Sequence, residues 1–138
     1  MIEHKSKTVL ESQLATQIAK QLEIAIKKNG SAKLLVSGGS TPIGMYHLLS
    51  LKQLDWAKVT VGLVDERYVP PTDANSNEKM IKENLLINEA APAHFISMYY
   101  ISNDEAENIR RADLEYQRFH TAIDVCVLGM GADGHTAS

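Results

Sequence analysis

The 138-residue sequence has one cysteine, few aromatic residues and no long apolar run. The single cysteine, Cys126, excludes a disulfide bond within the chain and favours a reducing compartment. No segment approaches the about 18 consecutive apolar residues that a membrane helix needs, and the first residues show no apolar core of a signal peptide. We therefore expect a cytoplasmic protein without a membrane partner.

The chain also has no excess of positive charge. Its formal net charge is −3 at pH 7, and no long run carries charge of one sign. Proteins that bind nucleic acid by neutralising phosphates usually present a basic surface, so nucleic acid is not an expected partner. Hydrophobic residues make up 44% of the chain, which is ordinary for a globular protein, and we expect residues 1–138 to form a single domain.

An apolar stripe near the N-terminus predicts the first helix. Thr8 and Glu11 have the spacing of a capping box, and Asn29-Gly30 is a typical helix end. Between them, apolar side chains recur every fourth residue: Leu10, Leu14, Ile18, Leu22 and Ile26. We expect this helix to cover a sheet.

Three further helices are predicted from caps and apolar spacing. The first has Thr41 as its N-cap and Pro42 in its first turn. The second starts at Asn75 and runs to about residue 87, and the third starts with a capping box at Ser102. Their inner faces are expected at Met45, Leu48 and Leu49, at Ile81 and Leu85, and at Ile109, Ala112, Tyr116 and Phe119.

Short apolar runs predict four strands, at residues 33–37, 59–64, 95–99 and 123–128, of which 95–99 is the weakest. Cys126 is expected to be buried, and Trp56 is expected to pack in the core or at its edge. Strands that alternate with helices are typical of an α/β fold. We predict a doubly wound, mostly parallel, Rossmann-like sheet with helices on both faces.

Three loops with ligand-binding or reactive side chains each follow a predicted strand, at residues 37–42, 65–68 and 129–135. The carboxyl ends of parallel strands lie at one edge of a sheet, and ligands bind outside that edge. The positions of the three loops therefore predict one site that all of them build.

The first of these loops contains Gly38, Gly39, Ser40 and Thr41, directly before a predicted helix. A glycine loop at a helix N-terminus binds phosphate through backbone N–H groups, and the two hydroxyls add donors. A tight turn that needs glycine for its backbone is the alternative. The spacing matches neither a Walker A loop nor the dinucleotide-binding glycine fingerprint.

The other two loops supply charge and a histidine. Asp65 and Arg67 stand where adjacent prolines force the chain out of the sheet, and the Arg67 guanidinium suits a phosphate or carboxylate. His135 titrates near neutral pH, Asp133 could orient it, and Gly131 lets the backbone approach a ligand. These residues predict an anionic substrate and histidine acid–base chemistry, by hydrolysis or isomerisation. Ligands are too few to predict a metal site.

Residues 35–42 (LVSGGSTP), 64–77 (VDERYVPPTDANSN) and 127–138 (VLGMGADGHTAS) resemble the three signatures of the 6-phosphogluconolactonase family. The resemblance implies hydrolysis of 6-phospho-D-glucono-1,5-lactone to 6-phosphogluconate in the pentose phosphate pathway, with no metal or organic cofactor. It implies that His135 activates water and that Asp133 supports it. The residues assigned to substrate binding are Gly38, Gly39, Ser40, Thr41, Asp65, Arg67 and Gly131.

Members of that family continue past the His-Thr-Ala-Ser motif, so the chain resembles the N-terminal portion of a longer family domain and lacks the C-terminal part. We expect these 138 residues alone to be weakly active or inactive, with an apolar edge and face of the sheet exposed.

Two alternatives stay open. One is a glucosamine-6-phosphate isomerase/deaminase, a class of enzyme that shares the fold of the family that the chain resembles. Its final motif, however, differs from Thr136-Ala137-Ser138 of this chain. A non-catalytic sugar-phosphate-binding domain would keep the glycine loop, but it would not need His135 together with Asp133.

Overall fold

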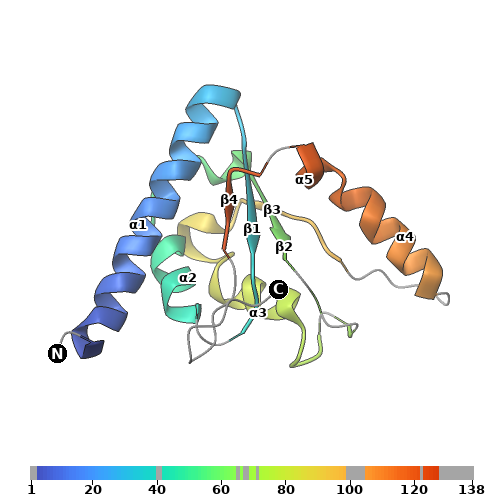
Figure 1. The fold of residues 1–138 in the computed structure, drawn as a ribbon, viewed down its shortest axis with the longest axis horizontal. Coiled ribbons are helices and arrows are strands. Elements are labelled where there is room, and N and C mark those ends of the chain that lie inside the picture. Colours follow the sequence, from blue (N-terminus) through green and yellow to red (C-terminus); the bar gives the residue numbers. More distant parts are fainter. Residues whose placement is uncertain are drawn as a thin grey trace.

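Four parallel strands form one sheet in the computed structural model of the chain, which describes residues 3–39, 42–64, 66, 69–70, 72–98, 105–121 and 123–127. The strands are β1 (Ala32–Val36), β2 (Val59–Leu63), β3 (His94–Phe95) and β4 (Val125–Cys126), in the order β3-β2-β1-β4. The register between β1 and β2 runs from Ala32 opposite Val59 to Val36 opposite Leu63. The predicted parallel α/β sheet is confirmed (Figure 1).

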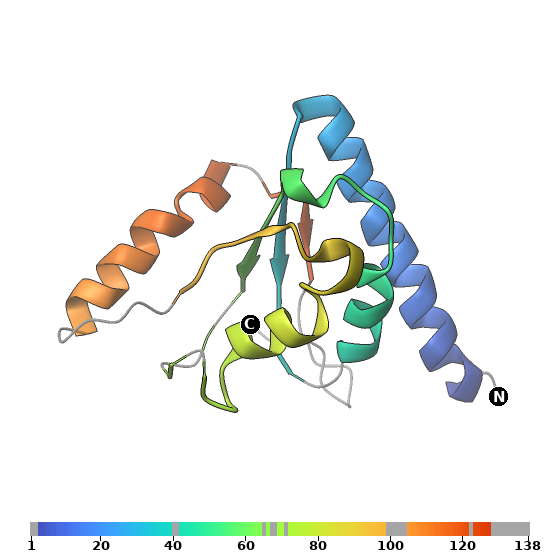
Figure 2. The ribbon, with the colours of Figure 1, turned by 180° about the vertical axis from the view of Figure 1, so that it is seen from behind.

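Helices lie on both sides of this sheet. They are α1 (Glu3–Asn29), α2 (Ile43–Ser50), α3 (Asn77–Asn84), α4 (Glu105–Tyr116) and α5 (Arg118–Thr121), with short 3-10 turns η1 (Trp56–Lys58) and η2 (Asn88–Ala90). Figure 2 shows α2 and α3 in front of the strands, with α1 beside α2. The helix pair α4–α5 approaches the sheet from the other side, where Phe119 lies against Gly62 of β2.

The main core lies between the sheet and helices α1, α2 and α3. Alternate residues of a strand point to opposite faces, and the set that points toward these helices is fully buried: Ala32, Leu34, Val36, Val59, Val61 and Leu63. Trp56 belongs to the same core, and its indole N–H donates to the Lys52 carbonyl at 2.9 Å. The predicted core position of Trp56 is therefore confirmed.

Helix α1 starts earlier than predicted. It begins at Glu3, so Thr8 lies inside the helix and the predicted start there is wrong. Its end is confirmed, because Gly30 has φ +84° and its N–H bonds to the Ile26 carbonyl at 2.8 Å.

The buried face of α1 also differs from the predicted stripe. Residues four apart advance by about 40° on a 3.6-residue helix, so a strict four-residue repeat winds around it. Leu10 and Leu14 are accordingly 59% and 46% exposed. The buried residues keep to one face: Ala15, Ile18, Ala19, Leu22 and Ala25.

The boundaries of α2 and α3 correct two further predictions. Pro42 is the N-cap residue of α2, not part of its first turn, and Thr41 lies outside the described residues. Ser76, not Asn75, caps α3, because its side chain accepts from the Lys79 N–H at 3.2 Å. The Asn75 N–H is bonded to the Asp73 side chain in a local turn. Helix α3 ends at Asn84 and not near residue 87.

The third and fourth strands and α4 also differ from the sequence prediction. Strand β3 covers His94–Phe95 only, and β4 covers Val125–Cys126. Helix α4 reaches the sheet with its C-terminal end and points away elsewhere, so Ile109 is exposed whereas Tyr116 is buried (Figure 1). Ser102, the predicted cap of this helix, lies outside the described residues.

Cys126 is exposed, which corrects its predicted burial. It stands opposite Leu35 in the sheet register, on the face that α5 covers at β2. Thiol size and polarity favour burial in general, but in this fold the place of residue 126 on the sheet decides its exposure.

Candidate functional site

The strand order β3-β2-β1-β4 reverses direction beside β1. The chain passes from β1 to β2 and β3 on one side and returns to β4 on the other side. Such a reversal is a topological switch point, and ligands in open α/β sheets bind there, outside the carboxyl ends of the strands. The loop after β1 and the segment after β4 both start at this point.

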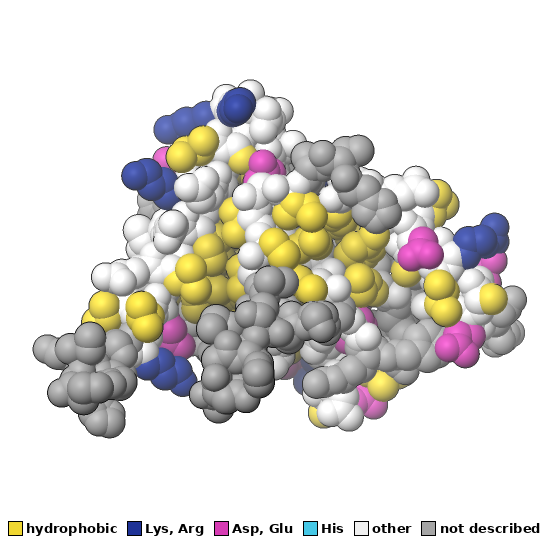
Figure 3. Space-filling view, viewed as in Figure 1, with side chains coloured by type: hydrophobic (Ala, Val, Ile, Leu, Met, Phe, Trp, Pro, Cys, Tyr) yellow, Lys and Arg dark blue, Asp and Glu magenta, His cyan; other side chains and the backbone are white. Residues whose placement is uncertain are grey.

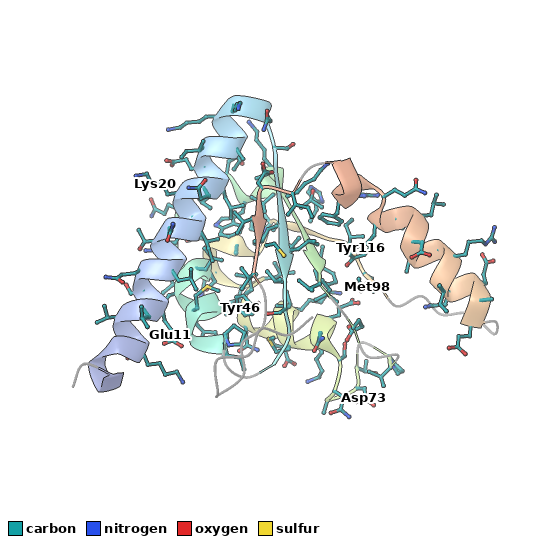
Figure 4. All side chains as sticks on the ribbon, viewed as in Figure 1. Glu11, Lys20, Tyr46, Asp73, Met98 and Tyr116 are labelled. Carbon is teal, nitrogen blue, oxygen red and sulfur yellow. The ribbon has the colours of Figure 1, made fainter. Side chains whose placement is uncertain are left out.

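Tyr46 of α2 holds the start of the first loop. Its hydroxyl donates to the Ser37 carbonyl at 2.6 Å and accepts from the Ser37 N–H at 3.1 Å (Figure 4). Burial raises the pKa of Tyr46 to about 12, although its bonds to Ser37 lower it in part. The phenol therefore keeps its proton and both hydrogen bonds at neutral pH. Tyr46 could not be predicted from the sequence, because nothing local indicates that its hydroxyl bonds to a residue nine positions earlier.

Ser37 itself brings a hydroxyl to the same place. The residue is buried, and among the described residues its Oγ has no hydrogen-bond partner. A buried hydroxyl without a partner costs about 1–3 kcal/mol. A ligand or further chain at this edge would gain from bonding it.

The two glycines of this loop are required for different reasons. Gly39 has φ +94°, a backbone conformation that favours glycine, and no atom of the described residues lies within 4 Å of the position a Cβ would take. A Cβ on Gly38 would lie 2.0 Å from the Asn77 Oδ1 atom, so the side chain of Asn77 fills that place. Gly39 thus provides the backbone conformation of the turn, and Gly38 leaves room for the Asn77 side chain. Ser40 and Thr41 lie outside the described residues.

Glu66 ties the second loop to the start of α3. Its Oε1 accepts from the Asn77 N–H at 2.7 Å, and its Oε2 accepts from the Glu78 N–H at 2.9 Å. The Ser76 hydroxyl adds a longer bond of 3.3 Å to Oε2. A carboxylate is favoured here because the first N–H groups of a helix lack partners within the helix.

Asn77 connects both loops. Its N–H bonds to Glu66, and its side chain packs on Gly38. The loops that follow β1 and β2 therefore both contact Asn77, the first residue of α3. From the sequence, Glu66 is only one of three consecutive charges after β2, of which at least one is expected in the site. Its contact with Asn77 could not be predicted, because the two residues lie eleven positions apart and no local spacing indicates the contact.

A second carboxylate lies beside the N-terminus of α2. A Cβ on Gly44 would lie 2.4 Å from a carboxylate oxygen of Glu11, so α1 and α2 meet closely there (Figure 4). Negative charge stabilises a helix N-terminus, and it also weakens the attraction of that terminus for another anion.

The predicted catalytic residues His135 and Asp133 lie outside the described residues, as do Asp65, Arg67 and Gly131. The side chains of two other histidines are described: His94 is exposed, and His47 bonds to Asn84 at 2.8 Å between α2 and α3. Within the described parts of the chain, no group of three or more His, Cys, Asp and Glu side chains could hold a metal ion. None of the described helices has both the length and the apolar composition to span a membrane.

The strand order and the helices on both faces define a doubly wound α/β protein. Residues 5–138 match the family of glucosamine-6-phosphate isomerases/6-phosphogluconolactonase, and the chain belongs to this family.

Its relatives include a 6-phosphogluconolactonase of Rhizobium meliloti, 44% identical over 95% of this chain and 56% of the relative. A 6-phosphogluconolactonase of Pseudomonas aeruginosa is also 44% identical, over 91% of this chain and 52% of the relative. A crystal structure of a 6-phosphogluconolactonase from Shewanella baltica superimposes with a TM-score of 0.87 at 42% identity, over 96% of this chain and 57% of that one. The chain thus spans a little over half the length of these relatives.

Proposed function

We propose that this chain carries the substrate-binding and catalytic motifs of a 6-phosphogluconolactonase, which hydrolyses 6-phospho-D-glucono-1,5-lactone to 6-phosphogluconate in the cytoplasm. The observation that carries this proposal is the 44% identity to the Rhizobium meliloti enzyme over 95% of the chain. The substrate is a small sugar phosphate lactone, and no metal or organic cofactor takes part.

In this proposal the phosphate binds at the switch point. The backbone of residues 38–41, the Ser40 and Thr41 hydroxyls and the Arg67 guanidinium hold its oxygens. Two features of the described residues support this placement: none of their atoms lies within 4 Å of a Cβ position on Gly39, and none of them bonds to the buried Ser37 Oγ. Asp65 and Gly131 complete the substrate contacts, with Asp65 accepting from sugar hydroxyls.

His135 acts as the general base, oriented by Asp133. It removes a proton from a water molecule as the water oxygen attacks the lactone carbonyl carbon. The bond between this carbon and the ring oxygen then breaks, and the proton passes to the ring oxygen, which becomes a hydroxyl. A lactone is reactive enough that one positioned base suffices without a covalent nucleophile.

A chimera provides the test, because the relatives are longer than this chain. Residues 1–138 are joined to the remaining C-terminal part of the Rhizobium meliloti enzyme. The rate of lactone hydrolysis is measured from the acid that the reaction releases. His135→Ala should lower kcat by about 100-fold or more, because it removes the general base. His94→Ala is the matched control, since His94 is exposed on β3, and it should leave kcat unchanged. An unchanged kcat in His135→Ala would show that His135 is not the general base.

The same chimera separates the alternatives. Deamination of glucosamine 6-phosphate without lactone hydrolysis would identify an isomerase/deaminase. Binding of 6-phosphogluconate with neither activity would identify a non-catalytic sugar-phosphate-binding domain. The 138-residue chain alone should hydrolyse the lactone weakly or not at all, and a full rate from it would contradict that expectation.

A further inference from the structure

Glu66 stands in the sequence between Asp65 and Arg67, two residues that the proposed function assigns to the substrate. Both oxygens of its carboxylate are bonded to backbone N–H groups at the start of α3. We propose that Glu66 is a positioning residue, which clamps the segment after β2 to the N-terminus of α3 and so holds Asp65 and Arg67 at the ligand edge. This inference rests on the proposed function, in which Arg67 binds the phosphate.

The geometry of the clamp restricts rotation as well as distance. Two N–H groups from consecutive residues, Asn77 and Glu78, bond to the two oxygens of one carboxylate, at 2.7 and 2.9 Å. Such charge-assisted bonds are about twice as strong as neutral ones. The helix dipole favours the same charge. The orientation of the Glu66 side chain is thus fixed at both oxygens.

The restraint on Glu66 also limits the backbone movement of its sequence neighbours, Asp65 and Arg67. Consecutive Cα atoms are about 3.8 Å apart, so Asp65 and Arg67 each lie one peptide unit from the anchored residue. An arginine that must bind a phosphate loses conformational entropy on binding, and a backbone held in place beforehand lowers that cost. The clamp therefore affects substrate affinity more than the chemical step.

Glu66 is unsuited to contact the substrate itself. Both of its oxygens already accept hydrogen bonds, and its negative charge would repel a phosphate. The other acid at this helix end, Glu78, is bonded to Ser97 and paired with Lys82 at 2.8 Å, so it does not replace Glu66. Asn77 extends the restraint to the first loop through Gly38.

Hydrogen exchange in the 138-residue chain tests the clamp without any activity. Glu66→Ala should speed amide exchange at the non-proline residues from 64 to 72 and at residues 77–78 by about tenfold or more, because both charge-assisted bonds are lost. Ser76→Ala is the matched control. It removes the side-chain cap of α3 and the longer 3.3 Å bond from the Ser76 hydroxyl to Glu66, but it leaves both backbone bonds to Glu66, so it should speed exchange only at the helix start. Unchanged exchange at residues 64–72 in Glu66→Ala would overturn the clamp.

Kinetics of the chimera separate positioning from mere stabilisation of α3. Glu66→Ala should raise KM for the lactone about tenfold with kcat changed less than about threefold, because it weakens ground-state binding of the phosphate. Glu66→Gln keeps one acceptor oxygen and should restore KM in part. Ser76→Ala destabilises the same helix and should leave KM within about twofold.

The outcomes for the two proposals are distinguishable. An active chimera whose KM is unaffected by Glu66→Ala contradicts the inference and leaves the proposed function intact. If KM rises equally in Ser76→Ala, Glu66 only stabilises α3, and this result also contradicts the inference. An unmutated chimera that hydrolyses no lactone refutes the proposed function, and the exchange experiment then still decides whether Glu66 clamps the loop.

Discussion

The two faces of the sheet differ sharply in how they are covered. On the face toward α1, α2 and α3, Leu34, Val61 and Leu63 are almost completely buried. On the opposite face, Phe119 of α5 covers Gly62, Leu35 is half-buried and Cys126 is exposed. Figure 3 shows apolar side chains gathered over the middle of the molecule in this view. The comparison indicates that packing against one face supplies most of the stability of this chain.

The largest expected effect is in the core of the covered face. Leu22 of α1 is fully buried there, whereas Leu14 of the same helix is 46% exposed. Leu22→Ala should lower the free energy of unfolding by about 2–5 kcal/mol through lost burial and a cavity. Leu14→Ala should change it by less than about 0.5 kcal/mol. Urea unfolding measures both, and equal losses in the two variants would break the comparison.

A pH dependence should come from Tyr46 on the covered side. Burial raises its pKa from 10.0 to about 12, so between these values the unfolded chain releases a proton that the folded chain keeps. The contribution of the protonated Tyr46 phenol to stability is therefore complete below about pH 10. Between about pH 10 and about pH 12, the free energy of unfolding falls by about 1.4 kcal/mol per pH unit.

Unfolding of Tyr46→Phe and of the unmutated chain at about pH 8 and about pH 11 measures this dependence, and the variant should lack this part of the loss. Tyr116→Phe is a matched control. The Tyr116 hydroxyl also makes two hydrogen bonds, accepting from the Leu63 N–H at 2.9 Å and donating to the Ile96 carbonyl at 2.7 Å (Figure 4). A pH profile that is identical with and without Tyr46 would show that its phenol does not contribute.

The smallest expected effect on stability is at the open face. Cys126→Ser should change the free energy of unfolding by less than about 0.5 kcal/mol, because the side chain is exposed. In the native chain the Cys126 thiol should react completely with a bulky disulfide reagent, without denaturant. A thiol that reacts only after unfolding would show that this face is covered in solution.

Much of the fold could be predicted because its signals are local. Apolar runs locate the strands at residues 33–37 and 59–64 to within one residue at each end, and Asn29-Gly30 marks the end of α1. The predictions that failed depended on neighbours in space. Periodicity alone does not tell which arc of α1 meets the sheet, and Ile109 is exposed because α4 diverges from it.

The residues of the candidate site also differ in whether a local pattern locates them. Gly38 and Gly39 could be located from the sequence, because a strand that passes into a glycine loop before a helix is a local pattern. Tyr46, Glu66 and Asn77 could not, because their partners lie nine or more residues away. Arg67, Asp133 and His135 stay predictions from sequence and family, since they lie outside the described residues.

The class of fold, the family and the three loops where chemistry is expected follow from the sequence. Hydrophobic period, glycine and charge act within a few residues, so they can be recognised along the chain. By contrast, the contact through which Glu66 and Asn77 join the loops after β1 and β2, and the more complete cover of one face of the sheet, are seen only in the folded chain. These features depend on hydrogen bonds and packing between segments that are distant in sequence, and such contacts exist only once the strands are in order.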